Sequence, residues 1–585
     1  MSKNKTKSIP LISFLLALIT LLGACQTTPV SPTTPSHTEI VSTTEIPTVS
    51  PSPSPTATPL PTATNTATPT PPPAAFWQMG LPETFVSEIV LPDGSSWQSD
   101  STLSRYHIIP FDKKQKLEPL AQTDWTYVLV APFFTVTDNL SYEDLRAFLA
   151  GNDMPDGAQE DTKVLMAQSD KAAILRLLNM SWAQNIKTVM ELDDISADAW
   201  GQDWAIVPFE ALEPQWKVIA VGGVSPLDHD FDPEVYKLNL RVGVFHNEQD
   251  NWENPENEFD FSTVLPSPNR DRSQLTSLIM TGVTAMARDT AFIMETEGVL
   301  YPGEKIRDLM RVADLTHISN EVSFYEDCPY PDPDYEGFIF CSNPEYIKLL
   351  DDLSADIIEL TGNHNNDVLA LYKVDSVPFT LDLYEQYEMQ WYAGGVNERD
   401  AKSPLLIEHN GNRLAFIGCN SYGPTMAWAL DERSGAAPCE DFGWLKSEVA
   451  DLRQKGYLPI VTFQFQEDYV REATSLQERD FRDVAQAGPV IVNGSQSHVA
   501  KAMEFYEGSF IHYGLGNLFF EQPDVYITYD SFIQEHYFYQ GRLINTRLHT
   551  ITIRDGGQPR LMTEEERQKF LTMIFDVSEP LRRTQ

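Results

Sequence analysis

The chain has 585 residues, of which 22% are charged, and its formal net charge is −42. This acidic balance excludes broad nucleic-acid binding, because nucleic-acid phosphates need a basic surface. It also excludes general adsorption to anionic lipid, so an anionic substrate would need a local basic pocket.

The N-terminus has the pattern of a secretory signal. Three lysines within the first seven residues precede an apolar run over 9–22. The run is short for a membrane span, which needs ~20 apolar residues, so a plain transmembrane anchor is the weaker alternative. Leu22-Gly23-Ala24-Cys25 resembles a bacterial lipobox. This resemblance implies that 1–25 is a lipoprotein signal peptide, that Cys25 is lipidated, and that the protein is extracytoplasmic and lipid-anchored to the cell membrane.

Residues 26–75 consist largely of proline, threonine and serine. Such a segment cannot bury enough apolar surface to offset its chain entropy, so we predict a disordered linker. Its prolines favour extended polyproline-II geometry, which suits a spacer between a membrane and a folded part. The remaining ~500 residues exceed one ordinary domain and predict at least two.

The first folded region is predicted over 76–266 as a small α/β domain. Apolar runs predict strands, and a serine before a polar-apolar pattern predicts the start of each helix. The expected strands cover 127–132, 163–167, 204–208 and 216–221, and the expected helices cover 141–151 and 169–178. The order of these elements and the segment 207–212 resemble one lobe of a periplasmic solute-binding protein, which implies a bound solute.

The second region is predicted over 275–554, after a polar connector at 267–274. Apolar runs that end in polar residues repeat along it, which is typical of an α/β fold. The expected strands cover 275–280, 313–322, 356–360, 414–418, 458–465 and 490–492. The remaining residues, 555–585, are predicted to form a charged tail that is helical around 564–575.

Polar side chains follow two of these strands. Gly362, Asn363 and His364 come directly after the strand at 356–360, and His498 comes after a later strand. The carboxyl ends of strands are where α/β proteins place their sites. An amide and imidazoles at such ends suit a divalent metal or a phosphate, although a buried histidine can also serve only as a hydrogen-bonding core residue.

Five cysteines are present, and without Cys25 an even number remains. In an exported chain this predicts disulfides. We favour Cys328 with Cys341 and Cys419 with Cys439, because each pair brackets a polar loop that contains proline or glycine. The other two pairings stay open. A zinc site is disfavoured, since no pair has the close spacing of a zinc ribbon.

A series of motifs in the second region resembles the CapA-type proteins of poly-γ-glutamate capsule synthesis. The matching blocks are Gly282 to Arg288, Asn320-Glu321, Gly362-Asn363-His364 with Asp367, Gly394-Gly395, Gln464-Phe465-Gln466 with Asp468-Tyr469, Gly494 to His498 and Tyr513 to Phe519. The resemblance implies a metallophosphatase-like, two-sheet α/β sandwich. It also implies an anionic surface polymer, or its precursors, as the partner.

Several positions depart from the family pattern. Val283 stands in place of an early aspartate, Gln464 in place of a histidine, and Gln496 or Ser495 in place of another. Because glutamine is a weak ligand and offers no imidazole, a complete two-metal centre is not expected. The resemblance leaves two alternatives for Glu321, Asn363, His364 and His498. They are the ligands of one divalent metal ion, or they bind a substrate through hydrogen bonds with no metal.

The same resemblance assigns further roles. Glu321, His364 and Asp468 are the predicted catalytic residues, with Glu321 or Asp468 as general base. Arg288 is predicted to grip a carboxylate or phosphate through its guanidinium group. The predicted substrate-binding set is Arg288, Asn320, Asp367 and Tyr469.

Two functions therefore compete. One is a metal-assisted hydrolase or transferase that acts on an amide or ester bond of a capsule-type polymer. The other is a non-catalytic surface receptor or scaffold that binds a polymer or a small solute. Retention of His364 and His498 favours the first function, and Val283 and Gln464 favour the second.

Overall fold

The computed structural model describes residues 74–112, 118–247, 259–335, 337–554 and 557–582. The predicted signal peptide, Cys25 and nearly all of the predicted linker lie outside these residues. None of the helices formed by the described residues combines the length and the apolar composition needed to cross a bilayer.

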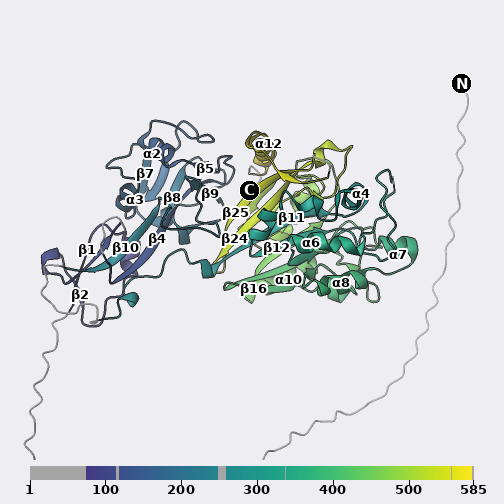
Figure 1. The fold of residues 1–585 in the computed structure, drawn as a ribbon, viewed down its shortest axis with the longest axis horizontal. Helices are drawn as coiled ribbons and strands as arrows, with labels where there is room; N and C mark the ends of the chain where they lie inside the picture. The colour runs from purple at the N-terminus through teal and green to yellow at the C-terminus, as the bar shows by residue number, and fades with distance from the viewer. Residues whose placement is uncertain (1–73, 113–117, 248–258, 336, 555–556, 583–585) are drawn as a thin grey trace, which may run out of the picture. The chain divides into compact units, whose positions relative to one another are not determined.

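The described part of the first region forms a ten-stranded sheet (Figure 1). Its main order is β2-β1-β3-β10-β4-β8-β6-β7, and β9 pairs with both β4 and β5. The strands are β1 (Ala75–Gln78), β2 (Ser96–Trp97), β3 (Tyr106–Pro110), β4 (Ala121–Pro132), β5 (Asn139–Leu140), β6 (Val164–Ala167), β7 (Ile186–Val189), β8 (Trp204–Pro208), β9 (Trp216–Val221) and β10 (Asn239–His246). The helices are α1 (Glu83–Ser87), α2 (Tyr142–Ala150) and α3 (Lys171–Leu177).

Local signals explain where these elements begin and end. Ser141 caps α2, since its Oγ accepts a hydrogen bond of 3.0 Å from the backbone N–H of Asp144. Gly151 ends the same helix in the left-handed region, at φ 77°. Trp204 of β8 is buried in the apolar core. The likeness to a solute-binding lobe stays a prediction.

The described part of the second region contains two larger sheets. The first has the order β14-β13-β12-β11-β24-β25-β26, with β23 beside β11, and the second has the order β16-β17-β19-β20-β22-β21. The strands of the first are β11 (Leu275–Thr284), β12 (Leu315–Asn320), β13 (Ile357–Glu359), β14 (Gln390–Tyr392), β23 (Asn517–Phe519), β24 (Asp530–Tyr539), β25 (Arg542–Thr552) and β26 (Arg560–Leu561). Those of the second are β16 (Leu405–His409), β17 (Asn412–Asn420), β19 (Leu458–Gln464), β20 (Ile491–Asn493), β21 (Met503–Tyr506) and β22 (Ser509–His512). A small pair, β15 (Gly394–Gly395) and β18 (Gly435–Ala436), lies outside both sheets.

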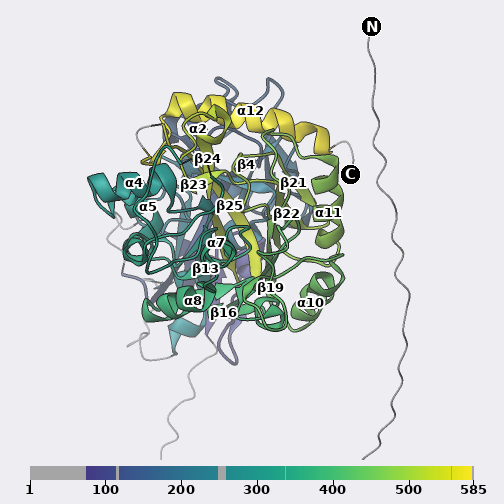
Figure 2. The same ribbon diagram turned by 90° about the vertical axis from the view of Figure 1, so that its right-hand side faces the viewer.

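Helices cover the outer face of each large sheet (Figure 2). The first sheet packs against α4 (Arg288–Glu297), α5 (Arg307–Val312), α6 (Ile347–Asp352) and α8 (Val377–Gln386). The second packs against α10 (Gly443–Gln454) and α11 (Ser475–Ala485). Two short helices, α7 (Asp367–Tyr372) and α9 (Glu398–Ala401), follow strand ends.

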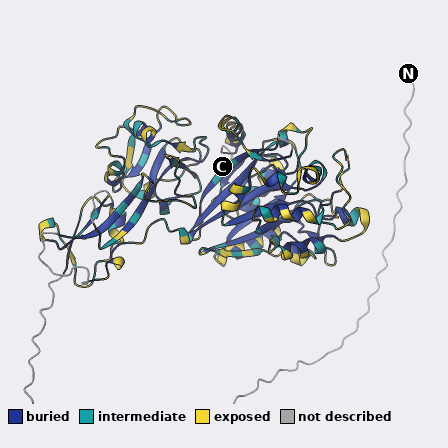
Figure 3. Cartoon of the chain, in the orientation of Figure 1, coloured by how far each residue is buried: buried dark blue, intermediate teal, exposed yellow. Residues whose placement is uncertain are grey.

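The two sheets pack on each other through a shared apolar cluster. Leu278 and Met280 of β11 meet Phe416 of β17 and Ile460 of β19 there. The strands are accordingly buried along most of their length (Figure 3). Helices, sheet, sheet and helices thus form four layers, and the predicted two-sheet α/β sandwich is confirmed.

The fold extends past the predicted boundary at 554. β26 pairs with β25, and α12 (Glu564–Arg582) follows it. Phe570 and Leu571 of α12 are buried against Phe505 and Phe532. The segment predicted as a charged tail therefore contributes a strand and a core-packed helix, because apolar residues recur on one face of α12.

Both favoured disulfides are present. Cys328 pairs with Cys341 and Cys419 pairs with Cys439. The first closes a loop between β12 and α6, and the second lies in the apolar cluster of the second sheet. The predicted pairing is confirmed.

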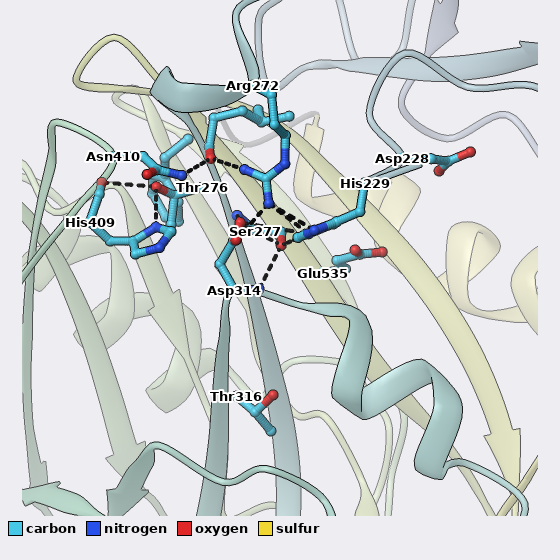
Figure 4. Close-up of polar contacts among 12 residues, drawn as sticks. Asp228, His229, Arg272, Thr276, Ser277, Asp314, Thr316, His409, Asn410 and Glu535 are labelled. Carbon is cyan, nitrogen blue, oxygen red and sulfur yellow. Dashed lines mark hydrogen bonds and ion pairs between the residues drawn. The ribbon is translucent and has the colours of Figure 1, made fainter. Parts of the chain in front are cut away.

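A polar cluster anchors the connector where β11 begins (Figure 4). The Asp314 carboxylate accepts hydrogen bonds from Arg272 Nη2 at 2.6 Å and from the backbone N–H of Ser277 at 2.8 Å. His229 Nε2 lies 2.7 Å from Ser277 Oγ, and Arg272 Nη2 lies 2.8 Å from His229 Nδ1. The end of the predicted polar connector is therefore fixed by side-chain hydrogen bonds.

Candidate metal centre

Four loops bring polar side chains to the carboxyl edges of the two large sheets. Glu321 follows β12 and His364 follows β13, and these two strands run parallel in the first sheet. Glu467 follows β19 and His498 follows β20, which run parallel in the second sheet. Since parallel strands end at the same edge, each sheet contributes one carboxylate and one imidazole.

These side chains converge on one place. Ligand atoms of Glu321, Glu467 and His498 all lie within 4.8 Å of one another. His498 Nε2 is 3.8 Å from Glu467 Oε2, and His364 Nε2 is 4.0 Å from Glu321 Oε1. The two histidines that the sequence singles out therefore lie around a common pair of carboxylates.

Each imidazole is oriented by an oxygen acceptor behind it. His364 Nδ1 lies 2.6 Å from Asp367 Oδ2, and His498 Nδ1 lies 2.8 Å from Asn517 Oδ1. Since both partners offer an oxygen, each Nδ1–H donates to it and each neutral ring keeps the lone pair on Nε2. This is the arrangement by which proteins orient histidines that bind metals.

Two buried oxygens at the centre have no hydrogen-bond partner among the described residues. They are Glu321 Oε1 and Asn363 Oδ1. The amide of Asn363 is held nearby, because its Nδ2 donates to Glu467 Oε1 at 2.9 Å. A buried polar atom without a partner costs free energy, so these oxygens call for a cation or a donor. Carboxylate, amide and imidazole ligands together fit a divalent ion such as Mn²⁺ or Zn²⁺.

The electrostatics of the cluster also favour a positive charge. Burial raises the pKa of Glu321, and the charges of His364 and His498 offset part of this rise. Burial lowers the pKa of His364, but the hydrogen bond with Asp367 and the charge of Glu321 outweigh burial and raise it overall. Without a metal, an imidazolium at 364 can supply the positive charge, so metal and proton compete for the same position.

Gly362 allows the loops after β12 and β13 to approach each other. A Cβ at this position would lie 2.6 Å from Glu321 Cα and 2.8 Å from Glu321 O. Val322 and His364 form an isolated parallel bridge beside this contact. Close approach of two backbones is therefore the reason for a glycine here, in a loop that turns sharply after β13.

The structure gives the predicted general base Asp468 a different environment. Its carboxylate forms an ion pair with Lys501. The carboxylate in the cluster belongs to Glu467, which the sequence motifs did not single out. The sequence pattern that could have identified Glu467 is its position three residues after the end of β19, at the same sheet edge as the other proposed ligands.

Two predicted substrate-binding residues support the site from behind. Asn320 Nδ2 donates to Val322 O at 2.8 Å and to Tyr384 Oη at 2.7 Å, which fixes the loop after β12. Asp367 accepts hydrogen bonds from His364 and, at 2.8 Å, from the backbone N–H of Phe340. Both side chains are buried and form hydrogen bonds within the protein, and their substrate-binding roles stay predictions.

The other two predicted substrate-binding residues lie nearer to solvent. Tyr469 is 44% exposed, and its Oη accepts a hydrogen bond of 3.2 Å from Gln522 Nε2. Gln522 Oε1 in turn accepts from Asn517 Nδ2, which links Tyr469 to the partner of His498. Arg288 Nε is buried without a hydrogen-bond partner in the part of the chain that the structure describes. Their substrate-binding roles stay predictions.

The side chains at the positions that depart from the family pattern are held by packing or by hydrogen bonds through their amide nitrogens. Val283 packs in an apolar cluster with Phe340. Gln496 Nε2 donates to Ser319 Oγ at 2.6 Å, and Gln464 Nε2 donates to a backbone carbonyl. The Oε1 atoms of Gln464 and Gln496 are buried without a hydrogen-bond partner among the described residues.

Comparison with known proteins identifies the segment that carries these residues. A family model described as "Bacterial capsule synthesis protein PGA_cap" matches residues 277–522. The chain is 23% identical over 278 residues to "Capsule biosynthesis protein CapA" of Bacillus anthracis, covering 47% of this chain and 66% of that protein. It is 22% identical over 258 residues to "PGA biosynthesis protein CapA" of Bacillus subtilis (strain 168), covering 44% and 66%. The chain thus spans just under two thirds of the length of each relative.

A solved 5'-nucleotidase precursor from Thermus thermophilus is also similar. It is 13% identical, covers 53% of this chain and 59% of its own, and has a TM-score of 0.30. A likeness at this level carries no argument about activity. Residues 277–522, which hold all four converging side chains, are therefore similar to the CapA-type family of bacterial capsule synthesis proteins.

Proposed function

We propose that this protein binds one divalent metal ion and uses it to hydrolyse or transfer an amide or ester bond of a capsule-type polymer such as poly-γ-glutamate. One observation supports this most strongly: two imidazoles, each oriented through Nδ1, turn Nε2 toward a pair of carboxylates. The family of residues 277–522 supports the choice of polymer.

The proposed ligands are Glu321, His364, Glu467 and His498, with Asn363 beside them. A bound divalent ion would polarise the carbonyl of the scissile bond and activate a water. Asp367 and Asn517 hold the two imidazoles in the ligating tautomer. Glu467 has a side-chain exposure of 31% against 2% for Glu321, so Glu467 is the carboxylate better placed to exchange a proton with solvent.

Arg288 is the proposed grip for a carboxylate of the polymer. Its buried Nε has no hydrogen-bond partner among the described residues. A guanidinium group can bind a carboxylate through two parallel hydrogen bonds, which would offset the acidic surface locally. We also propose that Cys25 is lipidated and that the anchor holds the folded part outside the cytoplasm. Loss of fatty-acid labelling in Cys25→Ser would test the anchor.

A non-catalytic receptor or scaffold is the second candidate. Val283 in an apolar cluster favours it, because the family pattern has an aspartate at this place. In this alternative the same converging side chains bind a polymer end without breaking a bond.

Calorimetric titration of the purified chain with Mn²⁺ and Zn²⁺, followed by an assay for amines released from poly-γ-glutamate, tests the proposal. We expect one metal per chain, loss of metal binding in His364→Ala and His498→Ala, and release of amines only with metal. His107→Ala is the matched control, because His107 lies in β3 and contacts the carbonyl of Ser101. Metal binding without any bond cleavage would favour the scaffold, and absence of metal binding would refute the proposed centre.

A further inference from the structure

An aromatic pocket lies beside the metal centre. Its cavity volume is about 260 Å³, and it lies between the loop closed by Cys328 and Cys341, the start of α4 and the end of α7. The aromatic side chains that line it are Tyr330, Tyr335, Phe340, Tyr346 and Tyr372.

The pocket opens on an exposed apolar surface. Tyr330 is 66% exposed, and Leu371 and Tyr372 at the end of α7 are 49% and 42% exposed. Large clusters of exposed apolar side chains are uncommon on soluble proteins. Such clusters often indicate a binding surface, whereas single exposed apolar side chains do not. The disulfide at the base of the loop fixes its two ends, so the pocket wall is preorganised.

The pocket also contains a positively charged side chain. Arg288 lines the cavity, and its Nε is buried with no hydrogen-bond partner among the residues that the structure describes. The backbone of Arg288 is held at φ 48°, a left-handed conformation that costs free energy in a non-glycine residue. Ala287, at the N-cap of α4, offers no side-chain cap, and the carboxylate of Asp289 in the first turn offsets part of the positive charge of the helix start and of the guanidinium. Among the described lining residues Asp332 is the one carboxylate.

The pocket and the metal centre share a wall. The ring of Phe340 lies 4.6 Å, centroid to centroid, from the ring of His364. The backbone N–H of Phe340 donates to Asp367, which orients the same histidine. A ligand in the pocket therefore lies next to the proposed reacting position.

We propose that this pocket binds an amphipathic anion: a ring-shaped or otherwise apolar group joined to a carboxylate or phosphate. The apolar part packs against Tyr330, Tyr335 and Tyr372, and the anion binds Arg288. The volume suits one single or fused ring system, since larger drug-sized ligands occupy pockets of roughly 300–1,000 Å³. The inference goes beyond the proposed function, because binding in this pocket requires no metal ion.

Fluorescence titration of the purified full chain with 1-anilinonaphthalene-8-sulfonate provides the test, since this dye joins a fused ring to an anion. We expect saturable binding that weakens about 10-fold in Arg288→Gln, the equivalent of losing one charge-assisted contact. Tyr372→Ala should weaken it to a similar extent. N-phenyl-1-naphthylamine, which lacks the sulfonate, should respond to Tyr372→Ala but not to Arg288→Gln.

Matched controls separate this site from nonspecific dye binding. Arg479→Gln removes a guanidinium whose side chain is 69% exposed, and Tyr526→Ala removes a tyrosine that is 77% exposed. Neither should change dye affinity, and unfolding temperatures should show that every variant is folded. Equal affinity in Arg288→Gln and the parent chain, or equal losses in the controls, would overturn the proposal. His498→Ala should keep dye binding, so a failed metal centre and a failed pocket give different results.

Discussion

His498 and Asn517 form a hydrogen bond of 2.8 Å between Nδ1 and Oδ1, across 19 positions of sequence. Asn517 opens β23, which pairs with β11 of the first sheet, whereas His498 follows β20 of the second. The bond therefore joins the two sheets at the edge where the proposed metal ligands lie. It also fixes the ring nitrogen that faces Glu467.

Replacement of Asn517 should weaken metal binding without removing a ligand. In Asn517→Leu the ring of His498 loses its acceptor, and loss of such a partner typically costs 10–100-fold in metal affinity. Asn517→Asp keeps an acceptor oxygen and should bind metal about as well as the parent chain. Calorimetric titration with Mn²⁺ measures both. Equal affinity in Asn517→Leu and Asn517→Asp would show that this bond does not orient a metal ligand.

The ligand-bearing edges were predictable because strand ends leave a clear sequence signal. Apolar runs place His364 and His498 just beyond predicted strands and Glu321 at the polar end of another, and parallel strands bring such residues together. The choice between Glu467 and Asp468 was not predictable, because the path of a loop decides which of two adjacent carboxylates turns inward. The hydrogen bond of Asn517 with His498 was also not predictable, because it depends on how the two sheets pack and not on a local sequence pattern.

Removal of the Cys328–Cys341 disulfide should affect both stability and the metal centre. The bond spans 13 positions, and opening a loop of this length costs about 3 kcal/mol in the chain-entropy model. Phe340 beside Cys341 contacts both Asp367 and His364, so Cys328→Ser with Cys341→Ser should also lower metal affinity.

The second disulfide is the control for this experiment. Cys419 and Cys439 are 20 positions apart and lie in the apolar cluster of the second sheet. Their replacement by serine should lower the unfolding temperature and leave metal affinity within a few-fold of the parent chain. Equal losses of metal affinity in the two double variants would contradict a direct link between the first disulfide and the centre.

A methyl group at position 362 should disrupt the centre. In Gly362→Ala the new Cβ meets backbone atoms of Glu321 at 2.6 and 2.8 Å, and backbone cannot move aside as a flexible side chain can. Overpacking of this kind costs about 1–3 kcal/mol, and it would separate Glu321 from His364. Gly411→Ala is the control: its Cβ meets nothing within 4 Å, although φ is +76°. It should cost about 1 kcal/mol and leave metal binding intact. Urea unfolding and metal titration distinguish the two variants.

Glu535 should make the free energy of unfolding depend on pH in the acid range. Burial would raise its pKa, but a hydrogen bond from His549 and the charge of Arg547 outweigh burial and lower it to about 2. The two contacts to Glu535 Oε2 measure 2.9 Å from His549 Nε2 and 3.4 Å from Arg547 Nη1. Since the folded pKa lies below the unfolded value of 4.5, the stabilisation is present above pH 4.5 and is lost as pH falls toward 2.

The size of this effect is about 3 kcal/mol at neutral pH, from 1.36 kcal/mol for each unit of pKa. Urea unfolding of the parent chain and Glu535→Gln at pH 7, 4 and 3 should therefore show a difference that shrinks as the pH falls. Glu565→Gln is the control, because Glu565 is exposed and pairs with Lys569 one helical turn away. It should differ little from the parent chain at any of the three pH values. The opposite outcome is a difference in free energy of unfolding between the parent chain and Glu535→Gln that stays constant from pH 7 to pH 3. The carboxylate of Glu535 would then have the same pKa in the folded and unfolded chain. In that case the charged contacts with Arg547 and His549 would not account for its contribution.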